Sequence, residues 1–394
     1  MNKGISRRRL LRNTLAVGCS TAASPLITPL TFASAPTGSR LVVIILRGAM
    51  DGLDVVQPYG DRNLRRLRPG FATGPAGGAH DLDGFFALHP ALGDLKPLWK
   101  AGELGFAHAV STPYRNKRSH FDGQDFLENG GSARDGRLTG RHDGWLNRAL
   151  GLIPGATSHT AYAVGRNRML LLDGAAPYSS WSPDGELDLP PGALSAIDRL
   201  YAADPLFRNA AQSAIELSAT ATGRMNARAA ARAGALAEYA AARLNEDARI
   251  AAFSIGGWDT HRAQKGALPI ALKELSSAIV ALNRKLGRNW RRTAVLAMTE
   301  FGRTARENGS GGTDHGTGGA MILAGGAIRG GKVYGRWPGL GGGDLYEGRD
   351  LNPTGDVRRY SAWALRALFG LGRSGIEGRV FPRLDMGGDP GIIA

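Results

Sequence analysis

The sequence is almost without cysteine, because Cys19 is the only one in 394 residues. It lies in an N-terminal segment that we expect to be removed. The mature chain should then have no disulfide, no thiolate nucleophile and no cysteine-ligated zinc. Lysine is also scarce, with 8 lysines among the 49 basic residues. The arginine excess comes with no nucleic-acid-binding motif, so we expect no nucleic-acid partner.

The first 35 residues contain no acidic residue and have the features of a twin-arginine signal peptide. Ser6-Arg7-Arg8-Arg9-Leu10-Leu11 precedes a weakly apolar segment that ends in small residues at Ala33-Ser34-Ala35. The segment is too short and interrupted for a permanent membrane anchor. An alternative is lipoprotein cleavage at Cys19, although Ala16 stands where leucine is usual. We predict a signal at 1–35, use of the twin-arginine export machinery, and a periplasmic or otherwise exported protein.

The net charge is +15, and the expected signal carries five of the cations, which leaves +10 (15 − 5) on residues 36–394. Such a basic surface can attract anionic substrates, anionic polymers or lipid headgroups.

Apolar runs alternate with helical patterns over residues 36–394, which we interpret as one domain. Strands are expected at 41–46, 103–110, 162–164, 169–172, 249–255, 294–298 and 320–324. Helices are expected at 92–100, from Ser119 onward, and at 144–152, 190–247, 267–286 and 356–369. This order predicts an α/β fold with a doubly wound, mostly parallel sheet and helices on both faces.

Residues that bind divalent metals follow three of the expected strands. They are Asp51, then Asp259 with His261, then Glu300 with Asp314 and His315. Ligands bind outside the carboxyl ends of the strands in open α/β sheets, so these side chains should meet at one edge. Each could instead be a turn or capping residue. Together they predict one or two divalent ions, with zinc as first choice and manganese, magnesium or calcium as alternatives.

Ser119 stands where a helix should begin, as a simple N-cap or as a nucleophile beside Arg118. Arg118 or Arg303 could hold the equatorial oxygens of a tetrahedral anionic group. We treat five further histidines as surface or packing residues: His80, His89, His108, His142 and His159. No role is assigned to His120.

Several motifs in a fixed order carry a family resemblance. They are LVVIILRGAMDGLD, STPYRNKRSHFD, GGWDTH, MTEFGRT and NGSGGTDHGTGG. With them the chain, from about residue 40 to about 375, resembles a bacterial family of twin-arginine-exported proteins of unassigned function. That family belongs to the alkaline phosphatase and sulfatase superfamily, so the resemblance implies an alkaline-phosphatase-like fold.

The resemblance also implies roles for individual residues. Asp51 matches a metal-bridging aspartate, Ser119 the nucleophile, and Asp259, His261 and His315 match metal ligands. A competing, sulfatase-like alignment makes Ser111 the modified residue, because Ser111-Thr112-Pro113-Tyr114-Arg115 fits a Ser-x-Pro-x-Arg pattern.

Two positions depart from the superfamily pattern. Phe301 follows Glu300 where a histidine is expected, which removes a ligand of the second metal unless Asp314 replaces it. The spacing of Asp259 and His261 is also narrower than usual.

The expected function is metal-dependent hydrolysis or transfer of phosphate or sulfate esters, with a small or polymeric anionic ester as substrate. The alternative is a non-catalytic cell-envelope binding protein that keeps the fold and a partial metal site.

Overall fold

The computed structural model describes residues 38–394 except 116, 135–136, 140–141, 167 and 183–231. All described residues belong to one compact unit, Ala35–Ala394. The expected signal at 1–35 and most of the expected helical stretch at 190–247 lie outside the described residues. Within the described part of the chain, no helix is both long and apolar enough to cross a membrane.

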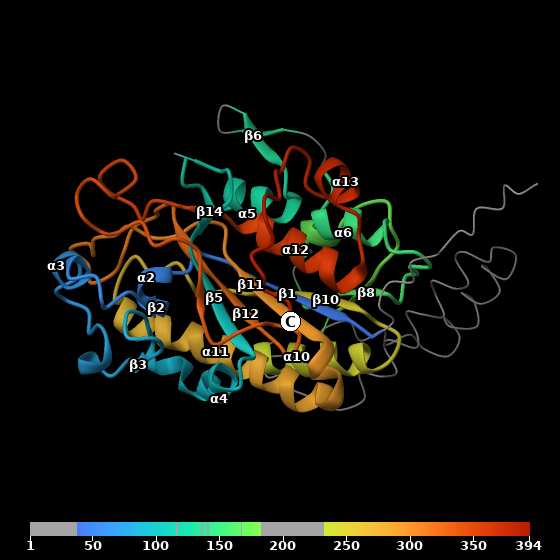
Figure 1. Ribbon diagram of the computed structural model, residues 1–394, viewed down its shortest axis with the longest axis horizontal. Coiled ribbons are helices and arrows are strands. Elements are labelled where there is room, and N and C mark those ends of the chain that lie inside the picture. Colours follow the sequence, from blue (N-terminus) through green and yellow to red (C-terminus); the bar gives the residue numbers. More distant parts are fainter. Residues whose placement is uncertain (1–37, 116, 135–136, 140–141, 167, 183–231) are drawn as a thin grey trace, which may run out of the picture. The chain divides into compact units, whose positions relative to one another are not determined.

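The architecture is an α/β sandwich built on a nine-stranded sheet with the order β13-β5-β12-β11-β1-β10-β8-β9, where β14 also pairs with β5 (Figure 1). The strands are β1 (Arg40–Leu46), β5 (Leu104–Ser111), β8 (Ala161–Val164), β9 (Ser179–Trp181), β10 (Ile250–Ile255), β11 (Thr293–Met298), β12 (Gly319–Ala324), β13 (Val333–Tyr334) and β14 (Gly355–Asp356). Of these described strands only β12 runs antiparallel to its neighbours. The mostly parallel α/β sheet predicted from the sequence is therefore confirmed.

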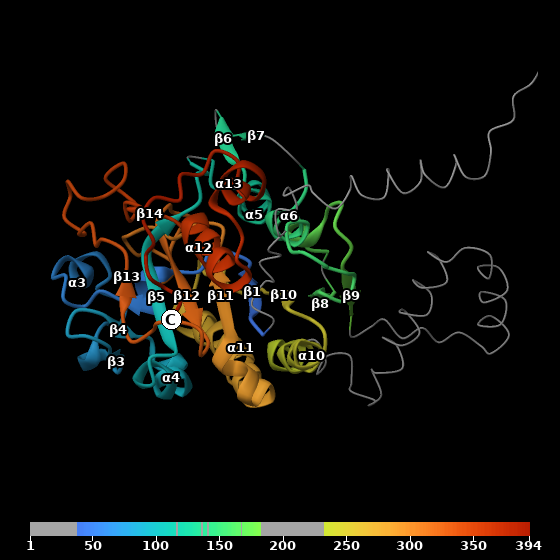
Figure 2. The same cartoon turned by 45° about the vertical axis from the view of Figure 1, so that its right-hand side comes forward.

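Helices cover both faces of this sheet (Figures 1 and 2). The helices are α2 (Gly52–Val55), α3 (Asn63–Leu67), α4 (Lys96–Lys100), α5 (His120–Asn129), α6 (Trp145–Leu150), α10 (Ala233–Asn245), α11 (Gln264–Leu286), α12 (Val357–Phe369) and α13 (Arg373–Gly375). Figures 1 and 2 place α5, α6 and α12 on one side of the sheet and α4, α10 and α11 on the other.

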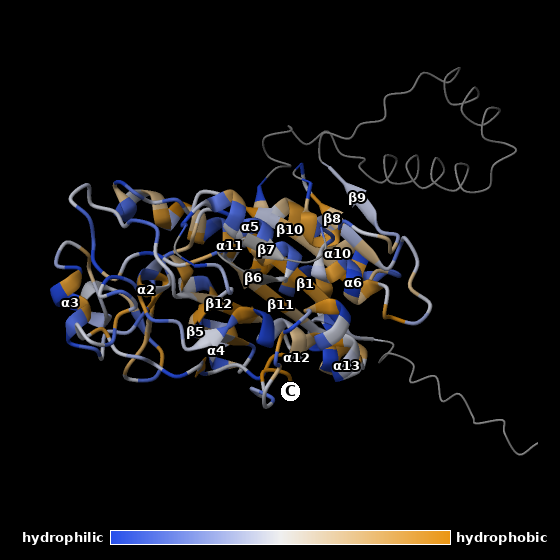
Figure 3. Cartoon of the chain, turned by 90° about the horizontal axis from the view of Figure 1, so that it is seen from above, coloured by the Kyte–Doolittle hydropathy of each residue, from blue (hydrophilic) through white to orange (hydrophobic). Residues whose placement is uncertain are grey.

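The alternation of β1 explains this arrangement, because successive side chains of a strand point to opposite faces. Val42 and Ile44 pack into the cluster that holds Leu272 of α11, whereas Leu41 and Val43 pack with Leu365 of α12. Both sets are fully buried, and Figure 3 shows the hydrophobic strands lying between the helices. A strand buried on both faces needs an unbroken apolar run, as residues 41–46 have.

Two small sheets lie outside the main one. The first has the order β2-β4-β3, and the second pairs β6 with β7. Their strands are β2 (Val56–Gln57), β3 (His80–Asp81), β4 (Ala87–Leu88), β6 (Ser132–Arg134) and β7 (Arg137–Thr139).

One predicted strand is wrong: residues 169–172 contain the 3₁₀ turn Leu170–Leu172 instead. Asn147 of α6 donates its amide to the carbonyl of Leu172 at 2.8 Å, and Leu171 donates its backbone N–H to Glu128 at 3.0 Å. These side chains satisfy backbone groups that a strand would have paired with a neighbour. An apolar run of four residues cannot show that such partners exist.

Candidate metal centre

The carboxyl ends of β1, β10 and β11 lie side by side at one edge of the sheet. The register pairs Leu46 with Ile255 and Ile45 with Met298, so the three strands stop at nearly the same level. β5 runs in the same direction, because it and β11 are both antiparallel to β12. The segments after these four strands therefore reach the same edge, as predicted for a ligand site.

Three histidine rings and one carboxylate converge there. His120 opens α5, Asp259 and His261 follow β10, and His315 lies between β11 and β12. The Oδ1 atom of Asp259 lies 3.4, 3.1 and 3.3 Å from the Nε2 atoms of His120, His261 and His315. The Nε2 atoms of His261 and His315 are 2.9 Å apart. We call these four side chains the histidine cluster.

The other nitrogen of each ring faces a hydrogen-bond acceptor. Nδ1 of His120 lies 2.8 Å from Glu300 Oε1, and Nδ1 of His261 lies 3.2 Å from Asp314 Oδ1. Nδ1 of His315 lies 2.8 Å from the carbonyl oxygen of Arg118. Carboxylate and carbonyl oxygens only accept, so the hydrogen-bond network assigns the ring proton to Nδ1 in all three. In the neutral rings the lone pair is then on Nε2, inside the cluster.

This arrangement fits a metal ion. Metal-binding histidines usually donate their second N–H to a carboxylate or a carbonyl, which fixes the tautomer and the ring orientation. The buried Nε2 of His120 has no hydrogen-bond partner among the described residues. Lone pairs of His261 and His315 face each other across 2.9 Å, with Nη1 of Arg303 at 3.4 Å from His261, and a cation or a proton between the two rings would relieve their repulsion. Imidazole and carboxylate donors suit zinc and manganese in particular.

Arg303 lies directly beside the cluster as a fixed cation. Its side chain is fully buried, and Nη2 lies 2.5 Å from Asp259 Oδ1. Its donors also reach the carbonyls of Gly48, Ala49, Trp258 and Thr313 at 2.8–3.1 Å, and Nη1 lies 3.4 Å from Nε2 of His261. Burial raises the pKa of Asp259, but the hydrogen bond and charge of Arg303 outweigh it, so that this pKa lies below its ordinary value. Asp259 is therefore ionised at neutral pH.

Two glycines allow the loops around Arg303 to approach closely. A Cβ atom on Gly302 would collide with the carbonyl oxygen of Gly318, and one on Gly316 would collide with the backbone of Arg303. This contact places His315 opposite Arg303, with which it forms an isolated β-bridge.

Glu300 was predicted as a ligand, but the structure places it behind the ring of His120. Its side chain is fully buried and also accepts from the N–H of Gly48 at 2.9 Å and the hydroxyl of Thr299 at 2.9 Å. Burial raises the pKa of Glu300, but the hydrogen bonds from His120, Gly48 and Thr299 lower it by more. This pKa therefore lies below its ordinary value. Asp314 has the same position relative to His261 and also accepts from Asn308 at 3.0 Å. Both carboxylates orient rings.

Asp51 lies outside the histidine cluster. Its two oxygens accept from Arg68 at 2.7 and 3.0 Å, and Gln264 donates to it at 2.7 Å. It also caps α2 through the N–H of Leu53. The side chains of Asp51 and Arg68 are each 1% exposed. The aspartate predicted to bridge a metal is thus held in a buried ion pair by an arginine.

Phe301, the residue that stands where a histidine was expected, forms one wall of the cluster. Its ring stacks on His120 at a centroid distance of 5.3 Å and an interplanar angle of 22°. It also lies 5.3 Å from His315 and 6.1 Å from Tyr114. Phe301 is 3% exposed, so its contribution is packing that shields the two imidazoles from water.

The predicted nucleophile Ser119 is the N-cap of α5 and precedes His120 directly. Its hydroxyl accepts from the N–H of Asp122 at 3.4 Å, and its own N–H donates to the hydroxyl of Tyr114 at 2.8 Å. Ser111, the alternative, is 5% exposed, donates to the carbonyl of Thr112 and accepts from Arg115. Of the two, Ser119 is the more accessible and the nearer to the cluster in sequence.

Arg118 does not point freely at this site. It forms ion pairs with Asp350 at 3.2 Å and Glu347 at 3.4 Å. Its backbone φ of 52° is uncommon for a residue other than glycine and turns its carbonyl to His315. In the structure Arg118 contributes to the cluster through this backbone carbonyl. Its role in binding substrate stays a prediction.

His120 is the residue that the sequence interpretation missed. The expected N-cap at Ser119 is the signal that could have identified it, because the first residue of a helix that follows a strand lies at the same edge as the other ligands. Without that argument, a lone histidine in a polar stretch looks like a surface residue.

The fold and the site together define an α/β protein with a histidine-rich candidate metal centre. Residues 106–378 match the family described as "Protein of unknown function (DUF1501)", and the chain belongs to this family. No curated protein sequence matches the chain.

Solved structures show partial similarity. A protein in the alkaline phosphatase superfamily from Vibrio parahaemolyticus has 11% identity, a TM-score of 0.39 and coverage of 89% of this chain and 71% of its own. The sulfatase PsFucS1 from Pseudoalteromonas sp. has 13% identity, a TM-score of 0.41 and coverage of 99% and 78%. Ps i-CgsB in complex with a neocarrahexaose has 10% identity, a TM-score of 0.42 and coverage of 86% and 74%.

Proposed function

We propose that the protein is an exported, metal-dependent hydrolase or transferase of phosphate or sulfate esters. One observation carries the proposal: three imidazole Nε2 atoms surround Asp259 Oδ1 while each Nδ1 is tied to an acceptor. The residues that would hold the ion are His120, Asp259 and His315, whose ligand atoms lie within 4.8 Å of one another, with His261 next to His315 as the fourth ligand. A bound divalent ion would polarise the ester and neutralise negative charge that develops on it.

Ser119 supports a nucleophilic displacement at phosphorus or sulfur. Ser119 lies at the N-terminus of α5, a 10-residue helix whose dipole favours negative charge there. In the proposed reaction the Ser119 hydroxyl gives up its proton as its oxygen bonds to phosphorus or sulfur, and the departing ester oxygen takes up that proton. Water, or an acceptor alcohol in a transferase, then bonds to the phosphorus or sulfur, the bond to Ser119 breaks, and the proton of the attacking hydroxyl returns to the serine oxygen.

The number of ions follows from two further contacts. Arg68 occupies both oxygens of Asp51, and Phe301 offers no donor atom. We therefore propose one ion per chain. Zinc is the first choice, because three imidazoles and one carboxylate suit it, and manganese is the alternative.

Elemental analysis of the mature protein, residues 36–394, tests the proposal. We expect about one equivalent of metal in the wild type and less than a tenth of that in His261→Ala, with both variants folded by circular dichroism. His159→Ala, which removes an exposed histidine, is the matched control and should keep its metal. Full metal content in His261→Ala would show that the cluster is not the site.

The chemistry is tested with a panel of phosphomonoesters, phosphodiesters and sulfate esters. We expect turnover of at least one class, lost in His261→Ala and in Ser119→Ala. A protein that binds one ion but hydrolyses none of them would instead fit the second candidate, a non-catalytic cell-envelope binding protein. The observation that favours this candidate is Phe301, which stands where a ligand of a second ion was expected.

A further inference from the structure

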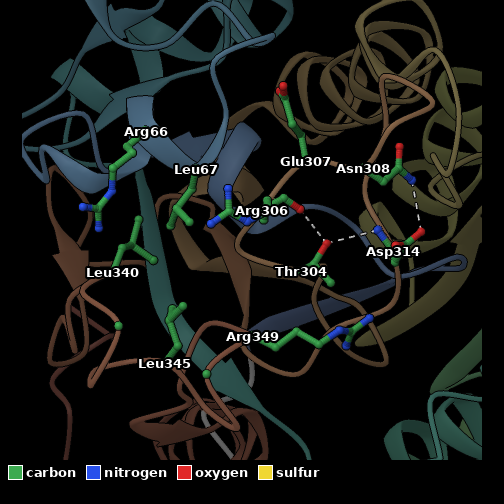
Figure 4. Close-up of a pocket in the computed structure, with 12 residues that line it drawn as sticks. Arg66, Leu67, Thr304, Arg306, Glu307, Asn308, Asp314, Leu340, Leu345 and Arg349 are labelled. Atoms are coloured by element: carbon green, nitrogen blue, oxygen red, sulfur yellow. Dashed lines mark hydrogen bonds between the residues drawn. The ribbon is translucent and has the colours of Figure 1, made fainter.

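A pocket of about 330 Å³ adjoins the histidine cluster, and none of the four cluster side chains lines it (Figure 4). Asp314 lines the pocket, and its Oδ1 atom is the acceptor for His261 Nδ1. Arg349 also lines it and donates to the carbonyl of His315 at 2.9 Å. Two lining residues thus contact two histidines of the cluster directly. The pocket therefore lies next to the cluster.

Three arginines line the pocket: Arg66 from α3, Arg306 from the loop after β11, and Arg349. Arg349 is paired with Asp350 at 2.9 Å. The guanidinium groups of Arg66 and Arg306 have no hydrogen bond or ion pair to any residue in the described part of the chain, and both residues are exposed. Planar guanidinium groups bind phosphate, sulfate and carboxylate through two parallel hydrogen bonds.

The two carboxylates of the pocket are already engaged. Both oxygens of Glu307 accept from the N–H of Gly70, at 2.9 and 3.0 Å, and Figure 4 shows this carboxylate turned away from Arg306. Asp314 accepts from Asn308 and His261. The groups left to meet a ligand are therefore the arginines.

Three leucines supply the apolar part of the lining, and the polar side chains of Thr304 and Asn308 already donate to other residues of the chain. Leu67 and Leu340 are 5% and 1% exposed and belong to one hydrophobic cluster, against which Leu345 packs. Leucine side chains beside two unpaired guanidinium groups suit a ring or short chain that carries an anionic substituent.

We propose that this pocket binds a second anionic group of the substrate, a phosphate, sulfate or carboxylate on the same molecule as the ester. The inference rests on the proposed function and narrows its substrate to esters with at least two anionic groups. A substrate whose only charge is the reacting ester leaves Arg66 and Arg306 without a partner.

Binding of two related probes tests the proposal. Glucose 1,6-bisphosphate and glucose 6-phosphate share the ring but carry two phosphates and one. We expect calorimetric titration of the mature protein at low salt to show roughly tenfold tighter binding of the bisphosphate, as charge-assisted hydrogen bonds provide. Arg66→Gln and Arg306→Gln should each remove most of that preference and leave the monophosphate affinity unchanged.

Arg65→Gln is the matched control, because Arg65 is an exposed neighbour on α3 that does not line the pocket. It removes the same charge and should keep the full preference. Equal losses in Arg65→Gln and Arg66→Gln, or no preference in the wild type, would overturn the proposal. Failure of the proposed function looks different: no metal and no ester turnover, with the arginine-dependent preference intact.

Discussion

The buried ion pair of Asp51 and Arg68 allows a direct test of whether Asp51 binds a metal ion. If Asp51 holds Arg68 and no metal, Asp51→Asn should cost stability and leave the metal content unchanged. Removing one partner of a buried ion pair costs about 3–5 kcal/mol, because the other charge stays buried without compensation. Arg68 keeps the carbonyls of Thr304 and Ala305, at 2.8 and 3.0 Å, so we expect the low end, about 3 kcal/mol.

The assay is urea unfolding of Asp51→Asn, Arg68→Met and the double variant, with metal content measured on each folded protein. Arg68→Met should cost about as much as Asp51→Asn, and the double variant clearly less than the sum, since neither charge is then left alone. All three should keep the wild-type metal content. Loss of metal in Asp51→Asn, with Arg68→Met as stable as the wild type, would refute the reasoning and restore Asp51 as a ligand.

Three further predictions follow from other contacts. Burial lowers the pKa of His108 to about 4 from 6.5, so the unfolded chain takes up its proton first as the pH falls. The unfolding free energy should therefore be unaffected above pH 6.5 and fall by roughly 3 kcal/mol between pH 6.5 and 4, a slope that His108→Gln should flatten. Glu300→Gln should weaken metal affinity about 10–100-fold in a chelator competition, because the amide is a poorer acceptor for His120; an unchanged affinity would contradict its orienting role. Replacing Arg7 and Arg8 by lysine should leave the full-length protein in the cytoplasm by cell fractionation, whereas export of this variant would contradict a twin-arginine signal.

The edge at which the site lies could be predicted because it depends on local features. Residues 41–46 and 294–298 are unbroken apolar runs, and such runs form strands buried on both faces. Parallel strands bring their carboxyl ends to one edge, which is enough to place Asp259, His261 and His315 together. In the structure the Nε2 atoms of His261 and His315 lie 3.1 and 3.3 Å from Asp259 Oδ1.

Which side chains enter the cluster could not be predicted, because it depends on partners distant in the chain. Asp51 is turned away by Arg68, whose position is fixed by carbonyls more than 230 residues further on. The carboxylate of Glu300 is held behind His120 by a hydrogen bond from the N–H of Gly48. His120 enters because α5 begins there, directly after its N-cap Ser119, and the ring centroid of His120 lies 4.3 Å from that of His315. None of these distances is encoded in the spacing of a motif.

Glu300 and Asp314 were predicted as metal ligands, but each contacts the cluster only through a hydrogen bond from a histidine Nδ1. The charges around the cluster account for this position. Arg303 already balances the charge of Asp259, and the three imidazoles are neutral when they bind a metal. A divalent ion in this site would therefore keep most of its positive charge, which favours binding of an anionic ester. The same excess charge opposes binding of the ion itself. Glu300 and Asp314 reduce that cost through the rings of His120 and His261, and they occupy no coordination position in doing so. We infer that this separation lets the centre hold a cation and still leave room for a negatively charged substrate.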